Sequence, residues 1–304
     1  MSDLPAVADR PKSLAERLGH HKDDRLLLLH ADDIGMCHSV NAATTRAMTE
    51  GVVSTGAIMV PCPWFPEIAA WSREHPQADL GLHLTLTAEW KYYRWRPVAP
   101  IAKVKGLVDK EGFLWRSVRE VVEHAKPVEV AIEIRAQIER ARQFGLQPTH
   151  VDTHMGTLFA SQGFFEAYIR VAKETGIMPM LFEDSPEIRR RAGQLGLDYA
   201  KLVKRLRREG YVLLDHMSPS VQGDTLETRQ RSYHEAIRNL GPGVTLMILH
   251  LSGDDPEIHH VTNNWKARYL EGLIFTSKET RDVLAQEKVK LIGYGDLGRL
   301  FTAS

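Results

Sequence analysis

The feature that most constrains this chain is a short, uninterrupted apolar segment that leads directly into two carboxylates. Residues 25–30 read RLLLLH, and Ala31, Asp32 and Asp33 follow. A strand with no polar face must be buried on both sides, as the central strands of parallel sheets are. The segment therefore predicts a central strand, and the two aspartates at its end predict a functional loop.

The alternation of strand-like and helical segments continues to the C-terminus. No glycine-rich nucleotide fingerprint follows the first strand, so a closed barrel is favoured over an open nucleotide-binding sheet. The predicted fold class is therefore α/β, with a parallel (β/α) barrel. We expect helices at 39–50, 64–74, 127–144 and 162–175, and strands at 51–60, 79–86, 148–153, 177–182, 211–215, 244–250 and 290–293.

A single domain is expected over residues 25–304. Within it, residues 88–126 hold aromatic and basic side chains without clear periodicity, which predicts a long excursion over the barrel mouth. Residues 1–24 carry mixed charges and no apolar run. They predict a surface arm, and they indicate neither a secretory signal nor a membrane span.

Charge and cysteine content limit the kinds of binding partner and metal site that are expected. Lys and Arg total 39, as do Asp and Glu, so no net field favours nucleic acid or an anionic membrane, and neither is expected as a partner. Cys37 and Cys62 are the only cysteines, too few for a disulfide framework or a thiolate metal cage. We therefore expect a cytoplasmic protein in which any metal has nitrogen and oxygen ligands. The oligomeric state stays open, a homodimer included.

Polar residues stand at the ends of three predicted strands. Asp33 follows the first strand, His83 lies in the segment 81–87 (GLHLTLT), and His154 ends the segment 148–154 (PTHVDTH). The carboxyl ends of parallel strands meet at one face, where barrel enzymes keep their active sites. One carboxylate and two imidazoles suit a hydrolytic metal site that leaves a coordination position open for water. We therefore predict that Asp33, His83 and His154 bind one divalent ion.

Two further residues are candidates for proton transfer. Adjacent side chains on an extended segment point in opposite directions, so Asp32 is not expected to share the ion with Asp33. Asp32 is better suited to be the general base. The apolar strand at 244–250 ends in His250, which would lie at the same mouth and protonate a leaving amine.

Each of these residues also has a purely structural interpretation. An aspartate pair after a strand is often a turn or a helix cap, and a lone histidine in an apolar strand is more often a hydrogen-bonded core residue. The polar segment 254–260 (DDPEIHH) is expected to be a solvated turn rather than a second metal site. Common placement at strand ends, without a GxSxG nucleophile motif, favours the catalytic interpretation. Four aromatic residues of the excursion could either stack on the rings of a sugar or pack on the barrel rim: Trp90, Tyr92, Trp95 and Trp115.

Four segments carry a family resemblance. They are residues 30–35 (HADDIG), 81–87, 148–154, and the stretch from Leu249 through Arg268 to Tyr294. In this order and spacing they resemble the YdjC-like carbohydrate deacetylase family, whose members include chitooligosaccharide deacetylases. The resemblance covers residues 26 to 294, nearly the whole chain.

This resemblance implies a distorted (β/α) barrel of the glycoside hydrolase/deacetylase type and one divalent metal ion, magnesium or zinc. It implies an enzyme that removes the acetyl group from an N-acetylated saccharide substrate. Two departures, MGTL at 155–158 in place of further histidines and His30 in place of the usual Asn, leave the sugar open. By position the resemblance assigns metal ligation to Asp33, His83 and His154, base catalysis to Asp32 and a place near the site to His250. Asp152 matches the family's acidic residue between the two histidines, and we expect it to have an orienting role. Arg268 is expected to contact the substrate.

Two other functions are compatible with these residues. A metal-dependent phosphoesterase or an amidohydrolase on a non-sugar substrate would keep the ion and cleave another bond. A non-catalytic carbohydrate-binding barrel would keep the fold without turnover. Asp32 beside Asp33 argues against the latter, because binding alone requires no base.

Overall fold

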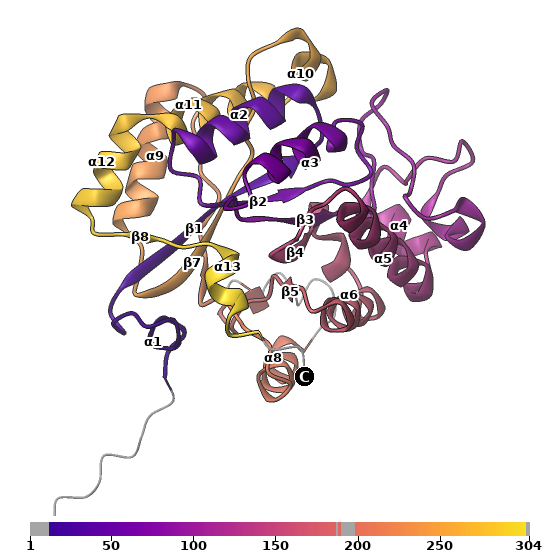
Figure 1. Cartoon of the computed structure of the whole chain (residues 1–304), viewed down its shortest axis with the longest axis horizontal. Coiled ribbons are helices and arrows are strands. Elements are labelled where there is room, and N and C mark those ends of the chain that lie inside the picture. Colours follow the sequence, from indigo (N-terminus) through magenta and orange to yellow (C-terminus); the bar gives the residue numbers. More distant parts are fainter. Residues whose placement is uncertain (1–11, 187, 190–197, 302–304) are drawn as a thin grey trace, which may run out of the picture.

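The computed structural model describes residues 12–186, 188–189 and 198–301. Within this part of the chain, parallel strands form one curled sheet in the order β5-β4-β3-β2-β1-β7-β6, and β8 pairs with β1. Helices pack around the outside of the sheet (Figure 1). The strands are β1 (Arg25–Ile34), β2 (Thr55–Ile58), β3 (Leu80–Leu84), β4 (His150–Thr153), β5 (Met178–Pro179), β6 (His216–Met217), β7 (Gly243–Leu249) and β8 (Lys290–Leu291).

The four predicted helices are present, but several helices of similar length after residue 175 were not predicted. The expected helices at 39–50, 64–74, 127–144 and 162–175 correspond to α2, α3, α5 and α6. The helices are α1 (Leu14–Arg17), α2 (His38–Thr49), α3 (Phe65–Glu74), α4 (Val118–His124), α5 (Pro127–Gln143), α6 (Gln162–Thr175), α8 (Tyr199–Arg208), α9 (Leu226–Arg238), α10 (Pro256–Val261), α11 (Trp265–Thr276), α12 (Lys278–Gln286) and α13 (Tyr294–Gly298).

Strand β1 is the centre of the sheet, as its apolar sequence predicted. It pairs with β7 along one edge, and with β8 and then β2 along the other. Ser54 occupies the junction on that second edge, because its hydroxyl donates to the Ile292 carbonyl and accepts the Leu29 N–H. Burial of both faces and pairing of both edges explain the four consecutive leucines at positions 26–29 of this strand.

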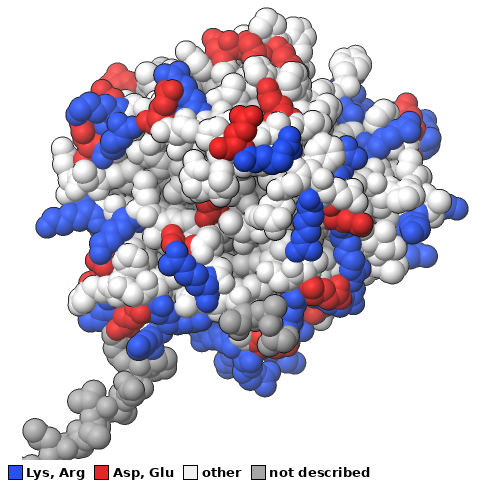
Figure 2. Space-filling model, in the orientation of Figure 1, with Lys and Arg blue, Asp and Glu red and all other residues white. Residues whose placement is uncertain are grey.

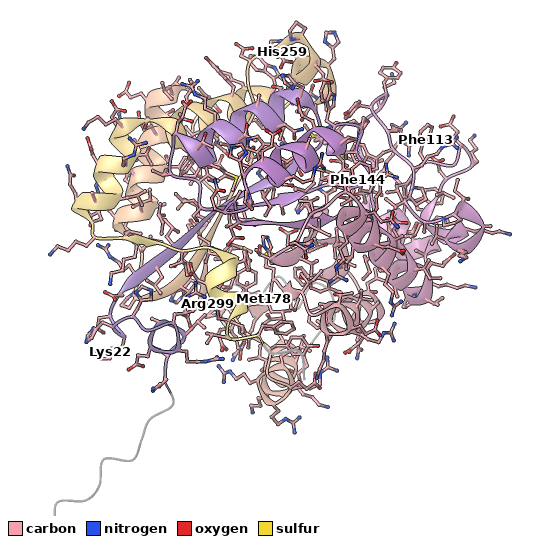
Figure 3. The ribbon with its side chains drawn as sticks, in the orientation of Figure 1. Lys22, Phe113, Phe144, Met178, His259 and Arg299 are labelled. Carbon is pink, nitrogen blue, oxygen red and sulfur yellow. The ribbon has the colours of Figure 1, made fainter. Side chains whose placement is uncertain are left out.

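The ends of the sheet meet through one short contact. Phe182, after β5, forms a parallel bridge with Leu214, before β6. The Leu214 N–H donates to the Leu181 carbonyl, and the Glu183 N–H donates to the Leu214 carbonyl, both at 2.8 Å. The result is the predicted distorted barrel, with its interior filled by apolar side chains such as Met178 (Figure 3).

Several strands are shorter than predicted, and one prediction is wrong. No strand runs over 211–215, where only the bridge at Leu214 is present, and β6 begins at His216 instead. Before β6 begins, the Asp215 side chain takes the place of a strand partner for β7, because its Oδ2 accepts the Val244 N–H at 2.8 Å. The expected strands at 51–60 and 177–182 shrink to Thr55–Ile58 and Met178–Pro179.

The expected N-terminal arm is partly docked. Residues 1–11 lie outside the described residues, but Leu14 and Ala15 of α1 are buried against the interior cluster that contains Leu26 and Leu28. The prediction of a surface arm is therefore wrong for this segment. Two leucines in a capped helical turn, at positions 14 and 18, bury enough apolar surface to fix it to the barrel.

The excursion at 88–126 is anchored by a buried carboxylate on α5. Glu133 is fully buried and accepts the N–H groups of Val98 and Ala99, each at 2.9 Å. Gln137 links it to β3, since its amide donates to Glu133 at 2.9 Å and to the Thr85 carbonyl at 2.7 Å. The loop is thereby tied to the segment that follows His83.

The surface carries charges of both signs. Figure 2 shows acidic and basic side chains interleaved over much of one face, with basic side chains gathered along the lower edge near α8. Part of this basic group is paired, because Arg205 lies 2.8 Å from Glu166 and Arg207 lies 2.5 Å from Glu183. No helix within the described residues is both long and apolar enough to span a bilayer.

We predict that Glu133→Ala destabilises the protein by about 2–4 kcal/mol, because it leaves buried N–H groups without an acceptor. Urea unfolding followed by circular dichroism measures the change. The matched control is Glu139→Ala on the same helix, where the side chain is exposed and the expected loss is under about 0.5 kcal/mol. Equal stability of the two variants would contradict the anchoring role.

Candidate metal centre and active site

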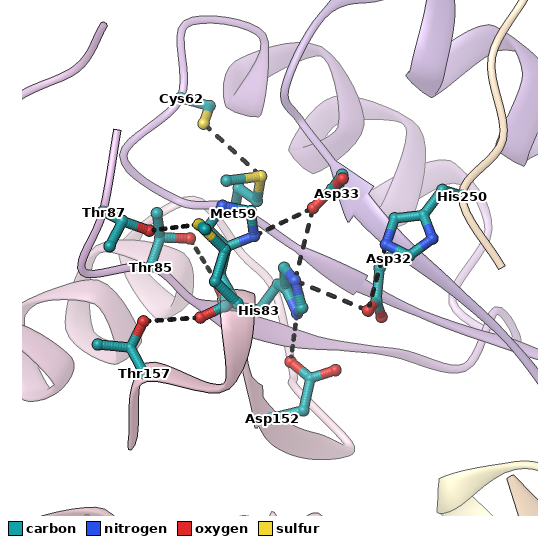
Figure 4. Close-up of polar contacts among 12 residues, drawn as sticks. Asp32, Asp33, Met59, Cys62, His83, Thr85, Thr87, Asp152, Thr157 and His250 are labelled. Carbon is teal, nitrogen blue, oxygen red and sulfur yellow. Dashed lines mark hydrogen bonds and ion pairs between the residues drawn. The ribbon is translucent and has the colours of Figure 1, made fainter. Parts of the chain in front are cut away.

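The strand-end residues singled out from the sequence lie at the carboxyl end of the sheet. Asp33 comes from the end of β1, His83 from β3, and His154 directly follows β4. All three are buried, and their candidate ligand atoms lie within 4.8 Å of one another. Figure 4 shows Asp33 and His83 with Asp32 and Asp152. The structure thus brings together the three residues predicted to bind an ion.

Both aspartates of β1 face this cluster. The expectation that they point in opposite directions is wrong, because Asp33 has a left-handed backbone with φ 64° and the β1–β2 register shifts between Ala31 and Ile34. Aspartate tolerates this conformation better than most residues. As a result, His83 Nε2 lies 3.8 Å from Asp32 Oδ2 and 3.5 Å from Asp33 Oδ1.

His83 is oriented by Asp152. Its Nδ1 hydrogen-bonds Asp152 Oδ1 at 2.7 Å, which leaves Nε2 to face Asp33. The other carboxylate oxygen, Asp152 Oδ2, hydrogen-bonds His30 Nε2 at 2.9 Å. Asp152 therefore lies where an orienting carboxylate is expected, one bond away from the ion site.

His154 is oriented through its other ring nitrogen by a residue that the sequence reasoning missed. Its Nε2 lies 3.1 Å from Glu89 Oε1, while its Nδ1 lies 3.2 Å from Asp33 Oδ1. Burial alone would lower the pKa of His154, but the Glu89 and Asp33 carboxylates raise it to about 10. The available signal was the position of Glu89, two residues after the GLHLTLT segment.

The cluster fits a divalent cation. Asp33 Oδ1 is buried and has no hydrogen-bond partner within the described residues, although two imidazole nitrogens face it. Burial would raise the pKa of Asp33, but the Arg268 guanidinium, 2.5 Å from Oδ2, holds it well below its usual range. An ionised carboxylate oxygen and two imidazoles form the ligand set of a hydrolytic zinc site. Asp33, His83 and His154 could therefore hold the ion.

Asp32 lies between the ion site and His250. Its Oδ2 is 3.9 Å from His250 Nε2, and its Oδ1 is 3.1 Å from His30 Nε2. The side chain of His250 is 43% exposed, whereas Asp32 is buried. A carboxylate at the base of the site and an imidazole at its rim could transfer protons on the two sides of a reacting bond.

His30 was noticed in the sequence only as a departure from the family pattern. It is fully buried and lies between Asp32 and Asp152. Burial alone would lower its pKa, but hydrogen bonding to Asp152 and the charge of Asp32 raise the pKa to about 10. A protonated His30 compensates part of the negative charge of the two carboxylates.

The aromatic residues of the excursion differ in how far their rings are exposed to a ligand. Trp95 is buried and its indole N–H donates to the Thr87 carbonyl, so packing is the one of the two interpretations that applies to this residue. Trp115 donates to the Gly106 carbonyl, and one face is covered by His124 at 4.3 Å between ring centroids. Trp90 is half-buried and packs edge-on against Trp95, while Tyr92 is 86% exposed.

Arg268, which was expected to contact the substrate, lies beneath the surface beside Asp33. It is buried, and its Nη2 donates to Asp33 Oδ2. Its Nη1 is also buried and has no hydrogen-bond partner within the described residues. Arg268 therefore fixes a candidate metal ligand and leaves one charged donor unpaired at the site.

We predict that Glu89→Gln weakens binding of a divalent ion about 10- to 100-fold, because the orienting charge on His154 is lost. Asp152→Asn should weaken binding similarly by acting on His83. Titration calorimetry with Zn²⁺ and with Mg²⁺ measures both changes. The control is Glu111→Gln, an exposed carboxylate of the same excursion. Binding by Glu89→Gln as tight as in the control would exclude the orienting role.

Comparisons with known proteins agree with the fold and the motifs. Residues 26–286 match the model of the family described as YdjC-like protein. A carbohydrate deacetylase from Thermus thermophilus is 30% identical over 273 residues, which cover 90% of this chain and 94% of that protein. A chitooligosaccharide deacetylase from Yersinia enterocolitica is 33% identical over 134 residues, 43% of this chain and 49% of that protein.

The fold also has a solved counterpart. The crystal structure of a proposed cellobiose-phosphate cleavage protein from Enterococcus faecalis superimposes with a TM-score of 0.74 and 23% identity, covering 90% of this chain and 99% of that chain. At this identity the likeness concerns the fold alone. The family match extends from β1 to the end of α12 and includes each candidate metal ligand. This chain belongs to the YdjC-like protein family.

Proposed function

We propose that this protein is a metal-dependent hydrolase that removes the acetyl group from an N-acetylated sugar or oligosaccharide. The observation that carries the proposal is the buried cluster of Asp33, His83 and His154 with a second carboxylate, Asp32, beside it. The carbohydrate deacetylase names of the relatives support the same reaction and substrate class. We also propose that the protein works in the cytoplasm, and we leave the ion as magnesium or zinc.

The ion site and the base have separate tasks. A divalent ion, when bound, supplies activation of a water molecule and polarisation of the acetamide carbonyl. Asp33, His83 and His154 would hold that ion, since their ligand atoms converge. Asp32 then accepts the proton of the attacking water, and its contact with His30 keeps Oδ2 directed toward the reacting atoms.

The leaving group needs a proton of its own. An amine that departs from the tetrahedral intermediate as an anion is a very poor leaving group, so a general acid lowers the barrier. His250 lies at the rim and within 3.9 Å of Asp32, which suits this role. Arg268, whose Nη1 is buried, would act through its ion pair with Asp33 rather than by contact with the substrate.

The reaction itself is tested by measuring acetate release from N-acetylated mono- and oligosaccharides with Mg²⁺, Zn²⁺ or a chelator added. We expect metal-dependent acetate release. Phosphate release from sugar phosphates, without acetate release, would instead identify a phosphoesterase.

Two variants separate metal binding from base catalysis. Asp32→Asn should keep its metal content but lose about two to four orders of magnitude in turnover, because the base is removed. His83→Ala should lose the ion, since it removes a ligand. Elemental analysis and acetate release on both variants measure this. If Asp32→Asn loses the ion as His83→Ala does, Asp32 is a ligand and not the base.

A third variant tests the general acid. His250→Gln should lose about two orders of magnitude or more on the acetamide substrate, because glutamine cannot deliver a proton. An activated acetate ester, whose leaving group needs little protonation, should show a much smaller loss. Steady-state rates on both substrates give the contrast. Equal losses on amide and ester would return His250 to a structural role.

A further inference from the structure

A second group of potential metal ligands lies further toward the amino ends of β1 and β4 than the first. His30 of β1 and His150 and Asp152 of β4 each offer a ligand atom, and these atoms lie within 4.8 Å of one another. Both imidazoles are fully buried, and Asp152 is 1% exposed. None of the three is a candidate ligand of the first ion, and His150 has no part in the proposed reaction.

His150 has one ring nitrogen that no hydrogen bond explains. The Thr149 hydroxyl donates to Asp79 Oδ1 at 2.6 Å, so it accepts the Nδ1–H of His150 at 2.9 Å. Nε2 then carries the lone pair, and it is buried without a hydrogen-bond partner within the described residues. An unpaired buried polar atom is costly unless something binds it. A partner on the other ring nitrogen is the usual way in which a metal-binding histidine is oriented.

The packing around His150 holds its ring in one place and keeps it neutral. A Cβ at Gly81 would lie 2.4–2.5 Å from three atoms of this ring, so β3 has room for the ring only because residue 81 is glycine. Tyr294 stacks on the ring with 3.8 Å between centroids. Burial and the charge of His30 hold the pKa of His150 well below its usual range. A neutral imidazole is the form that binds a metal ion.

The charges around His30 also favour a divalent cation. Its Nε2 lies 2.9 Å from Asp152 Oδ2 and 3.1 Å from Asp32 Oδ1, so two buried carboxylates share one imidazole. A proton on His30 compensates one of these carboxylates. A divalent ion that displaces this proton compensates both, and Asp152 Oδ1 keeps its hydrogen bond to His83. Two imidazoles and a carboxylate are ligands that suit zinc.

We propose that His30, His150 and Asp152 form a second, structural metal site that binds Zn²⁺. The ion would join β1 to β4, two strands that do not pair with each other in the sheet. When zinc binds, it displaces the proton of His30 to solvent, and the ring nitrogen and the Asp152 carboxylate become ligands. The inference goes beyond the proposed function, because it requires neither the first ion nor turnover.

The test removes the first site and then counts the zinc that remains. In the double variant His83→Ala, His154→Ala, two of the three candidate ligands of the first ion are gone. The full chain is produced with Zn²⁺, desalted, checked by circular dichroism and analysed by mass spectrometry for zinc. The added substitution His150→Gln, or separately His30→Asn, then breaks the second site. The matched control is His234→Gln, a buried histidine whose ring bonds the Thr280 hydroxyl.

We expect the double variant to keep about one zinc ion per chain, because the second site has its own ligands. Adding His150→Gln or His30→Asn should remove this zinc, and adding His234→Gln should not. A double variant without zinc overturns the proposal and leaves the buried nitrogens to water. Zinc that both His150→Gln and His30→Asn leave in place overturns it as well.

X-ray absorption spectroscopy of the zinc-loaded double variant requires no further buried substitution. It should show two imidazole ligands with oxygen in the remaining positions, and a spectrum with one imidazole or none overturns the assignment. The structural role is tested by thermal unfolding of the same variant with and without Zn²⁺. We expect zinc to raise the Tm by about 5 °C, since it binds the folded chain. An unchanged Tm would overturn the structural role.

Discussion

Mutual compensation of buried charges is the constraint on which the rest of this molecule depends. Asp152 hydrogen-bonds both His30 and His83, and these three residues come from three different strands. A buried ion without a partner costs several kcal/mol, and only good geometry with additional hydrogen bonds offsets that penalty. The network therefore forms only when β1, β3 and β4 are in register. These charged side chains are buried at the carboxyl end of the sheet, and their pairing allows the strands to pack there.

The same compensation gives the two histidines of the site different orientations. His83 is held at Nδ1 by Asp152, and His154 is held at Nε2 by Glu89. Each ring then directs its remaining nitrogen toward Asp33. Orienting carboxylates of this kind fix the tautomer of an imidazole and raise its basicity as a ligand. The pair converts two flexible rings into one preformed site.

The excursion at 88–126 is positioned by side chains of α5 rather than by its own sequence. Glu133 on α5 fixes the excursion at Val98 and Ala99, and Gln137 ties the same carboxylate to the segment after His83. Trp90 and Tyr93 of the excursion consequently pack against Trp95, while Tyr92 stays exposed.

The sequence by itself determined the class of fold and predicted most of the candidate site. The apolar run of β1, the strand-end placement of His83 and His154, and the periodic helices α2, α5 and α6 are local patterns with a direct physical cause. Tertiary structure decided what local pattern cannot encode. Asp33 shares the face of Asp32 because of a left-handed backbone and a register shift. Glu89 and His30 acquire their roles only from residues 65 and 122 positions away. Such pairings depend on which strands become neighbours, and that is set by the closed sheet as a whole.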